Sequence, residues 1–165
     1  MPSDFYAQLD GVKGESLDAD HKDWIEFHGF SHEISQPASA TASSAGGATS
    51  GRCQHKDFVI TKYIDAASPK LYEMCSSGKH MSKVSIELMR SSGGSKVKYL
   101  TIEMDQVVVS KVSPGVSSGD DLPTESVSFN YGKIQWTYTQ QKRSDGSGSG
   151  NIKGGWSLVE NKVAA

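Results

Sequence analysis

Short runs of β-branched and aromatic residues, each ended by Gly, Pro, Ser or Asp, recur along this chain and constrain its fold more than any other feature. Alternation with a period of two residues is typical of strands that are buried on one face. Many short strands separated by turn signals favour an antiparallel barrel or sandwich. The predicted strands cover residues 5–9, 24–35, 58–64, 84–90, 97–112, 124–129, 133–140 and 155–159.

One segment has a helical pattern instead. Ser68 is a suitable N-cap residue, Pro69 would occupy the first helical position, and Gly78 would end the helix. We therefore predict a helix of about two turns over residues 69–77 that flanks the sheet. Its apolar stripe consists of Leu71, Tyr72, Met74 and Cys75. The predicted fold class is mainly β, with one flanking α-helix.

The second predicted strand changes the parity of its apolar positions part-way along. Ile25 and Phe27 share one face, whereas Phe30 and Ile34 share a face of the opposite parity. A bulge at Gly29 would reconcile the two halves. If Phe30 and Ile34 face the core, the opposite face of the second half is polar, and it carries Ser31, Glu33 and Ser35.

A long connection over residues 36–54 contains no Val, Ile, Leu or aromatic residue. Structureless stretches of about 20 residues are uncommon inside a domain. This loop is either a mobile tether or, in a subunit that assembles, a contact element. The candidate contact residues are Pro37, Ala38, Ser39, Thr49 and Arg52. A second, Gly/Ser-rich connection over residues 142–150 is expected to be flexible.

Length and charge restrict the class of protein further. A chain of 165 residues is expected to form one domain over residues 1–165. Seventeen basic against 19 acidic residues give a net charge of −2, which disfavours nucleic acid as a partner. No window reaches the roughly 20 apolar residues of a membrane-spanning helix, and the first residues do not resemble a signal peptide. We expect a cytoplasmic protein with two free thiols, Cys53 and Cys75.

A possible nucleophile motif lies at residues 115–119, which match the pattern G-x-S-x-G around Ser117. That pattern has a catalytic role on a turn between a strand and a helix, with a His later in the chain. Here no helical pattern follows, and the last histidine is His80. The segment is therefore interpreted as a loop, and we predict that the protein is not an enzyme.

Metal binding is also not expected. His28 and His32 are four residues apart, which on a strand corresponds to about 13 Å, too far for one metal ion. The other histidines show no zinc-like spacing with the cysteines. We predict neither a cofactor nor a metal, and interpret His28 and His32 as residues of a polar face or an interface.

Several motifs in order resemble the Hcp (haemolysin-coregulated protein) family, whose members are inner-tube subunits of type VI secretion systems. The resemblance covers most of the chain, and so many matches in register are far more specific than any one motif. The matching segments are VKGES at 12–16, FVITKYID at 58–65, SPKL at 68–71, CSSGKH at 75–80, YLTI at 99–102, VVVSKV at 107–112, TESVSF at 124–129 and GW at 155–156.

The resemblance implies an antiparallel barrel with one helix that closes into a hexameric ring, and rings that stack into a tube. It implies export with effector proteins, to the extracellular space or a target cell and without a signal peptide, together with spike and sheath components as partners. The tube protein would also carry or chaperone its cargo. On this interpretation Ser31, Glu33 and Ser35 line the ring channel, and residues 36–54 connect stacked rings. A monomeric β-sandwich that binds, for instance, a glycan is the alternative; a hydrolase that depends on Ser117 ranks third.

Overall fold

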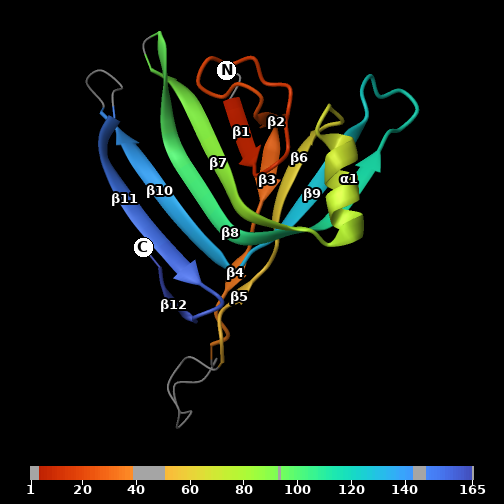
Figure 1. Cartoon of the computed structure of the whole chain (residues 1–165). Helices are drawn as coiled ribbons and strands as arrows, with labels where there is room; N and C mark the ends of the chain where they lie inside the picture. Colours follow the sequence, from red (N-terminus) through yellow and green to blue (C-terminus); the bar gives the residue numbers. More distant parts are fainter. Residues whose placement is uncertain (1–3, 39–50, 93, 143–147, 165) are drawn as a thin grey trace.

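Antiparallel pairing joins the strands in the computed structural model, which describes residues 4–38, 51–92, 94–142 and 148–164 (Figure 1). The elements in chain order are β1 (Asp4–Leu9), β2 (Ile25–Phe27), β3 (Gly29–Ser31), β4 (Ile34–Ser35), β5 (Gln54–His55), β6 (Phe58–Tyr63), α1 (Ser68–Ser77), β7 (His80–Ser92), β8 (Ser95–Gly115), β9 (Thr124–Asn130), β10 (Lys133–Gln141), β11 (Gly148–Ser157) and β12 (Lys162–Val163).

The long strand β8 organises the sheet, because its two halves have different neighbours. Its first half pairs with β7 and β10, and its second half pairs with β9. The order continues through β9 to β6 and β3 on one side, and through β7 to β1 and β2 on the other. Since β2 leads directly into β3, the barrel closes there, and β10, β11 and β12 extend the sheet beyond it. The predicted antiparallel barrel is confirmed.

The core fills the inside of this barrel. It consists of the side chains at alternate positions along each strand, which point inward. Phe58 and Ile60 of β6 are completely buried, as are Ile86 of β7 and Met104 of β8. Each such side chain stabilises the fold by about 1.5–3 kcal/mol. Helix α1 is the one helix among the described residues, and it lies against the barrel beside β8 and β9 (Figure 1).

The helix has the expected length but a different start. Leu71 and Met74 are buried on its inner face, and Gly78 ends it with a φ of 67°. The N-cap residue is Ala67, however, and no side chain caps the helix, so the prediction of Ser68 as the N-cap is wrong. The hydroxyl of Ser68 donates instead to Glu125 of β9, a buried partner that spacing along the sequence does not reveal.

The predicted bulge at Gly29 is also wrong, because the region forms three separate strands. β2 pairs with β1, and β3 pairs with β6, so the chain changes neighbours at His28. The His28 amide donates to the Thr61 carbonyl oxygen at 3.0 Å and joins the two parts. The change of parity therefore marks the point where the barrel closes.

Both connections differ from the prediction at their ends. Gln54 belongs to β5, which pairs with β4 to form a separate two-stranded sheet, here called the β4–β5 ribbon. β11 begins at Gly148, since backbone pairing with β10 continues to Gln141, so residues 148–150 are strand and β11 is longer than the strand predicted at 155–159. Residues 143–147 lie outside the described part of the chain.

Two parts of the segment between β1 and β2, residues 14–16 and 23–24, lie side by side. The Gly14 amide donates to the Asp23 carbonyl oxygen at 2.7 Å, and the Ser16 amide donates to the Trp24 carbonyl oxygen at 3.1 Å. His21 anchors the segment, because its ring nitrogens lie 2.7 Å from the Asp18 carboxylate and 2.6 Å from the Glu87 carboxylate of β7.

This close approach predicts that Gly14→Ala destabilises the protein. A Cβ atom at Gly14 would lie 2.3 Å from the Trp24 carbonyl oxygen, so the backbone must shift, at a cost of about 1–3 kcal/mol. Gly29→Ala is the control, since its Cβ would meet open space and stability should change by less than about 1 kcal/mol. Urea unfolding measures both, and equal stability of the two variants would contradict the prediction.

Candidate functional site

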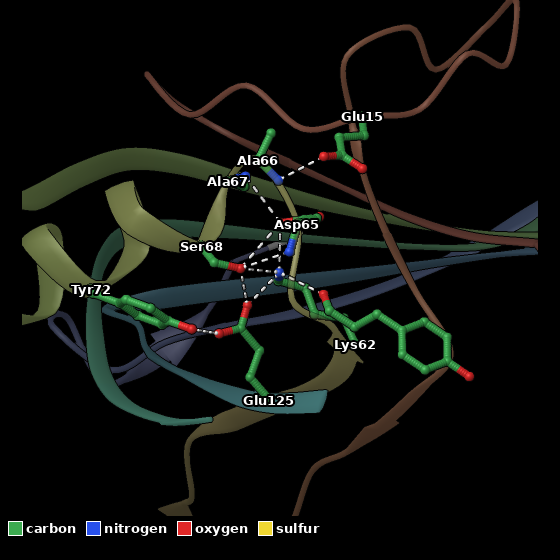
Figure 2. Close-up of polar contacts among 9 residues, drawn as sticks. Glu15, Lys62, Asp65, Ala66, Ala67, Ser68, Tyr72 and Glu125 are labelled. Atoms are coloured by element: carbon green, nitrogen blue, oxygen red, sulfur yellow. Dashed lines mark hydrogen bonds and ion pairs between the residues drawn. The ribbon is translucent and has the colours of Figure 1, made fainter. Parts of the chain in front are cut away.

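An ion pair between Lys62 and Glu125 lies inside the molecule, where charged side chains are rare (Figure 2). The two residues face each other across β6 and β9, and the Lys62 Nζ lies 2.5 Å from the Glu125 Oε1. The Nζ also donates to the Asp65 carboxylate at 2.8 Å, to the Ser68 hydroxyl at 3.2 Å and to the Tyr63 carbonyl oxygen at 3.2 Å. Oxygen atoms of the protein therefore replace water as the hydrogen-bond acceptors of the ammonium group.

Helix α1 supplies the remaining donors to Glu125. The Ser68 and Tyr72 hydroxyls donate to the two carboxylate oxygens, each at 2.5 Å. Burial raises the pKa of Glu125, but the hydrogen bonds from Lys62, Ser68 and Tyr72 outweigh it and leave the pKa below its usual value. Burial and the hydrogen bond to Glu125 raise the pKa of Tyr72 to about 12. The carboxylate thus stays charged and holds the helix against the barrel.

The segment between β6 and the helix is fixed by the same charges. The Asp65 carboxylate accepts from the Ala67 amide at 3.0 Å, and Glu15 accepts from the Ala66 amide at 2.9 Å. Glu15 belongs to the segment after β1, so β6, β9, the helix and the N-terminal segment meet at one point (Figure 2). We call Lys62, Asp65, Ser68, Tyr72 and Glu125 the charge cluster.

Sequence analysis missed this cluster, although strand parity contained a signal for it. Lys62 has the same parity as Phe58 and Ile60, and Glu125 has the same parity as Val127 and Phe129. A single charge of each sign at an inward position of two strands predicts an ion pair if the strands are neighbours. That β6 and β9 are neighbours could not be derived from the local pattern.

The sites considered from the sequence were a nucleophile at Ser117 and a metal site. Ser117 is exposed, and its amide donates to the Asp120 carboxylate within a turn. No set of three or more His, Cys, Asp or Glu residues in the described ranges is arranged to hold a metal ion. Cys53 and Cys75 are free thiols. Over the same ranges, no helix is both long and apolar enough to cross a membrane.

The candidate channel residues are all exposed, but they do not share one strand. Ser31 is the last residue of β3, Glu33 follows it and forms an ion pair with Lys56 at 3.3 Å, and Ser35 lies in β4. Ser31 and Glu33 line one cavity of about 460 Å³.

The expectation that the neighbouring apolar residues face the core is wrong. Phe30 is 40% exposed and Ile34 is 43% exposed. Phe30 stacks on Phe58 from outside, with ring centroids 5.3 Å apart. After Ser31 the chain leaves the barrel for the ribbon, so Ile34 has no core to face.

The loop that contains the candidate contact residues begins after β4 and ends before β5, the two strands of the ribbon. Pro37 is half-buried, whereas Ala38 and Arg52 are exposed. The Gln36 side-chain amide donates to the Gly51 carbonyl oxygen at 3.0 Å and joins the two sides of the loop. Ser39 and Thr49 lie outside the described residues.

A second buried polar cluster lies below the ribbon. The Tyr131 hydroxyl is 2.8 Å from the His32 Nε2 and 2.7 Å from the His55 Nδ1. Tyr131 is buried between β9 and β10, and both histidine rings are half-buried. Sequence analysis placed His32 on a polar face or an interface but did not connect it with His55 or Tyr131. We call these three residues the His–Tyr–His cluster.

Two apolar surfaces are exposed on different parts of the sheet. Tyr138 of β10 pairs with Leu100 of β8 and with Ile152 of β11; Tyr138 is 41% exposed and Ile152 is 66% exposed, whereas Leu100 is half-buried. We call these three residues the β10–β11 patch. The second surface, the β6–β9 patch, consists of Tyr63, Ile64 and Leu122, which lie where β6 ends and β9 begins. β10–β11 and β6–β9 are on opposite sides of the molecule in Figure 1.

Comparison with known proteins agrees with this architecture. A family model described as "Type VI secretion system effector, Hcp" matches residues 6–138. The protein hcp1 of Pseudomonas aeruginosa is 37% identical over 164 residues, which are 99% of this chain and 100% of that protein. The chain belongs to the Hcp family of type VI secretion proteins. This family comprises structural and secreted proteins and is not an enzyme family.

Two further relatives support the same assignment. The "Major exported protein" of Pseudomonas aeruginosa is 30% identical over 132 residues, covering 76% of this chain and 74% of that protein. A solved structure of a type six secretion system protein superposes with a TM-score of 0.90 at 32% identity, covering 98% of this chain and 99% of that one. The resemblance drawn from the sequence is confirmed.

The charge cluster predicts a large effect of Lys62→Met. Removal of one partner leaves the Glu125 carboxylate buried and uncompensated, which should lower the free energy of unfolding by about 3–5 kcal/mol. Lys70→Met is the control, because Lys70 forms an exposed pair with Glu73 within the same helix and should contribute less than about 1 kcal/mol.

Urea unfolding of both variants measures the difference. The double replacement of Lys62 and Glu125 by Met should recover part of the loss, because it leaves no unpaired charge. A Lys62→Met variant as stable as Lys70→Met would show that the ion pair is not required.

Proposed function

We propose that this protein is a subunit of the type VI secretion inner tube that forms hexameric rings. The observation that carries the proposal is the β10–β11 patch. Ile134 of β10 is completely buried, Trp136 is half-buried and Tyr138 is exposed along one face of the strand. The apolar face of the core thus continues beyond the barrel into solvent, where a second copy would cover it.

The positions of the two patches support a ring over a two-fold dimer. In a closed ring each copy uses two different surfaces, one for each neighbour. The β10–β11 patch and the β6–β9 patch are such a pair, since they lie on opposite sides of the barrel (Figure 1). On this proposal the β10–β11 patch of one copy packs against the β6–β9 patch of the next.

The candidate channel residues and the candidate loop residues are assigned to the remaining contacts of a tube. Ser31, Glu33 and Ser35 line the channel, where they meet the effector cargo that the tube carries or chaperones. The loop over residues 36–53, with Pro37, Ala38, Ser39, Thr49 and Arg52, contacts the next ring. Spike and sheath components are the further partners. Export from the cytoplasm then follows assembly.

Ile152→Glu tests the lateral contact. A charge placed in the apolar interface without a partner should raise the concentration needed for ring assembly at least about tenfold, with the barrel intact. Val159→Glu is the control, because Val159 is 68% exposed but lies in the turn between β11 and β12, outside both patches. Sedimentation velocity measures the oligomer and circular dichroism measures the fold. Rings of Ile152→Glu at the parent's concentration would remove the β10–β11 patch from the interface.

Replacement of residues 38–51 by a short Gly-Ser link tests the stacking contact. Rings should form while tubes and secretion are lost, and closure of a shorter loop costs little chain entropy. A similar replacement of residues 142–147 is the control and should leave tubes intact. Electron microscopy and a secretion assay are the measurements. Monomers would assign the loop to the lateral interface, and normal tubes would show that it is only a tether.

A further inference from the structure

The β4–β5 ribbon depends on the rest of the protein for its position. Its two strands pair with each other and, within the described ranges, with no strand of the barrel. An isolated two-stranded hairpin is marginally stable in water. Two cavities border the ribbon and its approach, one of about 530 Å³ lined by His55 and Trp136 and one of about 460 Å³ lined by His32. Each cavity is thus lined by one histidine of the His–Tyr–His cluster.

Each histidine of the cluster comes from the ribbon or its approach, and the tyrosine comes from the barrel. His55 is in β5, His32 precedes β4, and Tyr131 connects β9 with β10. The His32 ring also packs on Phe58 and Trp136, at centroid distances of 5.3 Å and 6.3 Å. The two hydrogen bonds to one hydroxyl therefore connect the ribbon to the barrel wall.

We propose that the His–Tyr–His cluster is an acid-sensitive latch, which holds the β4–β5 ribbon against the barrel at neutral pH and releases it when both histidines are protonated. The described residues next to the ribbon, 36–38 and 51–53, are continuous with its two strands.

The hydrogen-bonding capacity of a phenol limits the number of protons that the latch tolerates. The Tyr131 hydroxyl has one proton, so it donates to one imidazole nitrogen and accepts from the other. This arrangement is complete with both rings neutral, and it survives one added proton on the ring that already donates. With both rings charged, each directs an N–H at the same oxygen, and the phenol proton has no acceptor. The two ring centroids are only 6.5 Å apart, so the charges also repel.

The surroundings disfavour the charged rings as well. Burial lowers the pKa of His32, and the nearby His55 lowers it further, against an opposing effect of the Lys56 backbone. Burial lowers the pKa of His55 too. Burial raises the pKa of Tyr131, and the charge of Asp57 acts in the same direction, so the phenol keeps its proton.

The charged groups around the cluster come from the ribbon and from the segment that follows it. Glu33 and Lys56 neutralise each other at 3.3 Å, and Asp57 accepts hydrogen bonds from Ser110 and Asn130. Arg52 and Cys53 line the cavity beside His55. No carboxylate is bonded to either ring in the described part of the chain, in contrast to His21, which lies between Asp18 and Glu87.

The sign of the pH dependence follows from the lowered values. In the closed latch the pKa of each histidine is lower than its usual 6.5. At pH values between the lowered pKa and 6.5, the open state of the ribbon therefore binds more protons than the closed state. The latch is therefore fully stable above about pH 7, and it weakens progressively as the pH falls below 6.5. A loss of ring stacking in acid, which release of the ribbon would cause, rests on the proposed function, whereas the opening of the ribbon itself does not.

Hydrogen exchange of the Lys56 amide measures the latch directly, because this amide donates to the Glu33 carbonyl oxygen at 3.0 Å, one residue outside each strand of the ribbon. After correction for the intrinsic rate, its protection should fall at least about tenfold from pH 7.5 to pH 5, since each pH unit of differential proton binding is a factor of ten. Amides of the β7–β8 hairpin serve as the reference and should not change. Equal protection of Lys56 at both pH values would overturn the proposal.

Two variants separate the latch from general acid effects. Tyr131→Phe removes both hydrogen bonds, so the ribbon should already exchange fast at pH 7.5. His55→Asn retains a side-chain N–H donor near the position of Nδ1 and does not titrate, so it should retain protection at pH 5. A His55→Asn variant with the full acid response would place the switch elsewhere. The mass of the same samples shows whether rings are present, so a failure of ring formation is distinguished from a failure of the latch.

Discussion

The ion pair between Lys62 and Glu125 is the interaction on which the arrangement of this molecule depends. It joins neighbouring strands of the barrel, and through the Ser68 and Tyr72 hydroxyls it also fixes the helix. A buried ion pair stabilises a fold only if its remaining hydrogen-bonding capacity is satisfied. Here the charge cluster meets that condition, and β6, β9 and the N-terminal segment therefore hold one relative position (Figure 2).

The fixed positions of these strands also determine where the exposed apolar surfaces lie. The apolar face of the sheet continues past the barrel at β10 and β11, and a second apolar surface lies at the far end of β6. In the proposed ring, these two surfaces of the chain are the contacts between neighbouring copies. The ribbon, in contrast, is attached to the barrel by the hydrogen bonds of the His–Tyr–His cluster, between uncharged side chains. Because histidine gains a charge in acid, we propose that the response to acid occurs there.

Strand periodicity and turn residues were sufficient to predict a mainly β barrel or sandwich with one helix, and the ordered motifs were sufficient to identify the family. They failed where a residue's environment depends on distant pairing. Parity assigned Phe30 to the core, because it could not show that the chain changes neighbours at His28, between β2 and β3. The His–Tyr–His cluster was beyond reach for the same reason, since Tyr131 is 99 residues from His32 and 76 residues from His55. Local sequence carries no information about contacts of that separation.

The mass of the purified parent chain in solution tests the central claim most directly. If the proposed ring forms, native mass spectrometry or light scattering at neutral pH should give about six times the 17.7 kDa of one chain, because each copy would cover the apolar surfaces of its neighbours. A mass of 17.7 kDa at every accessible concentration would contradict the account and favour a monomeric binding module instead.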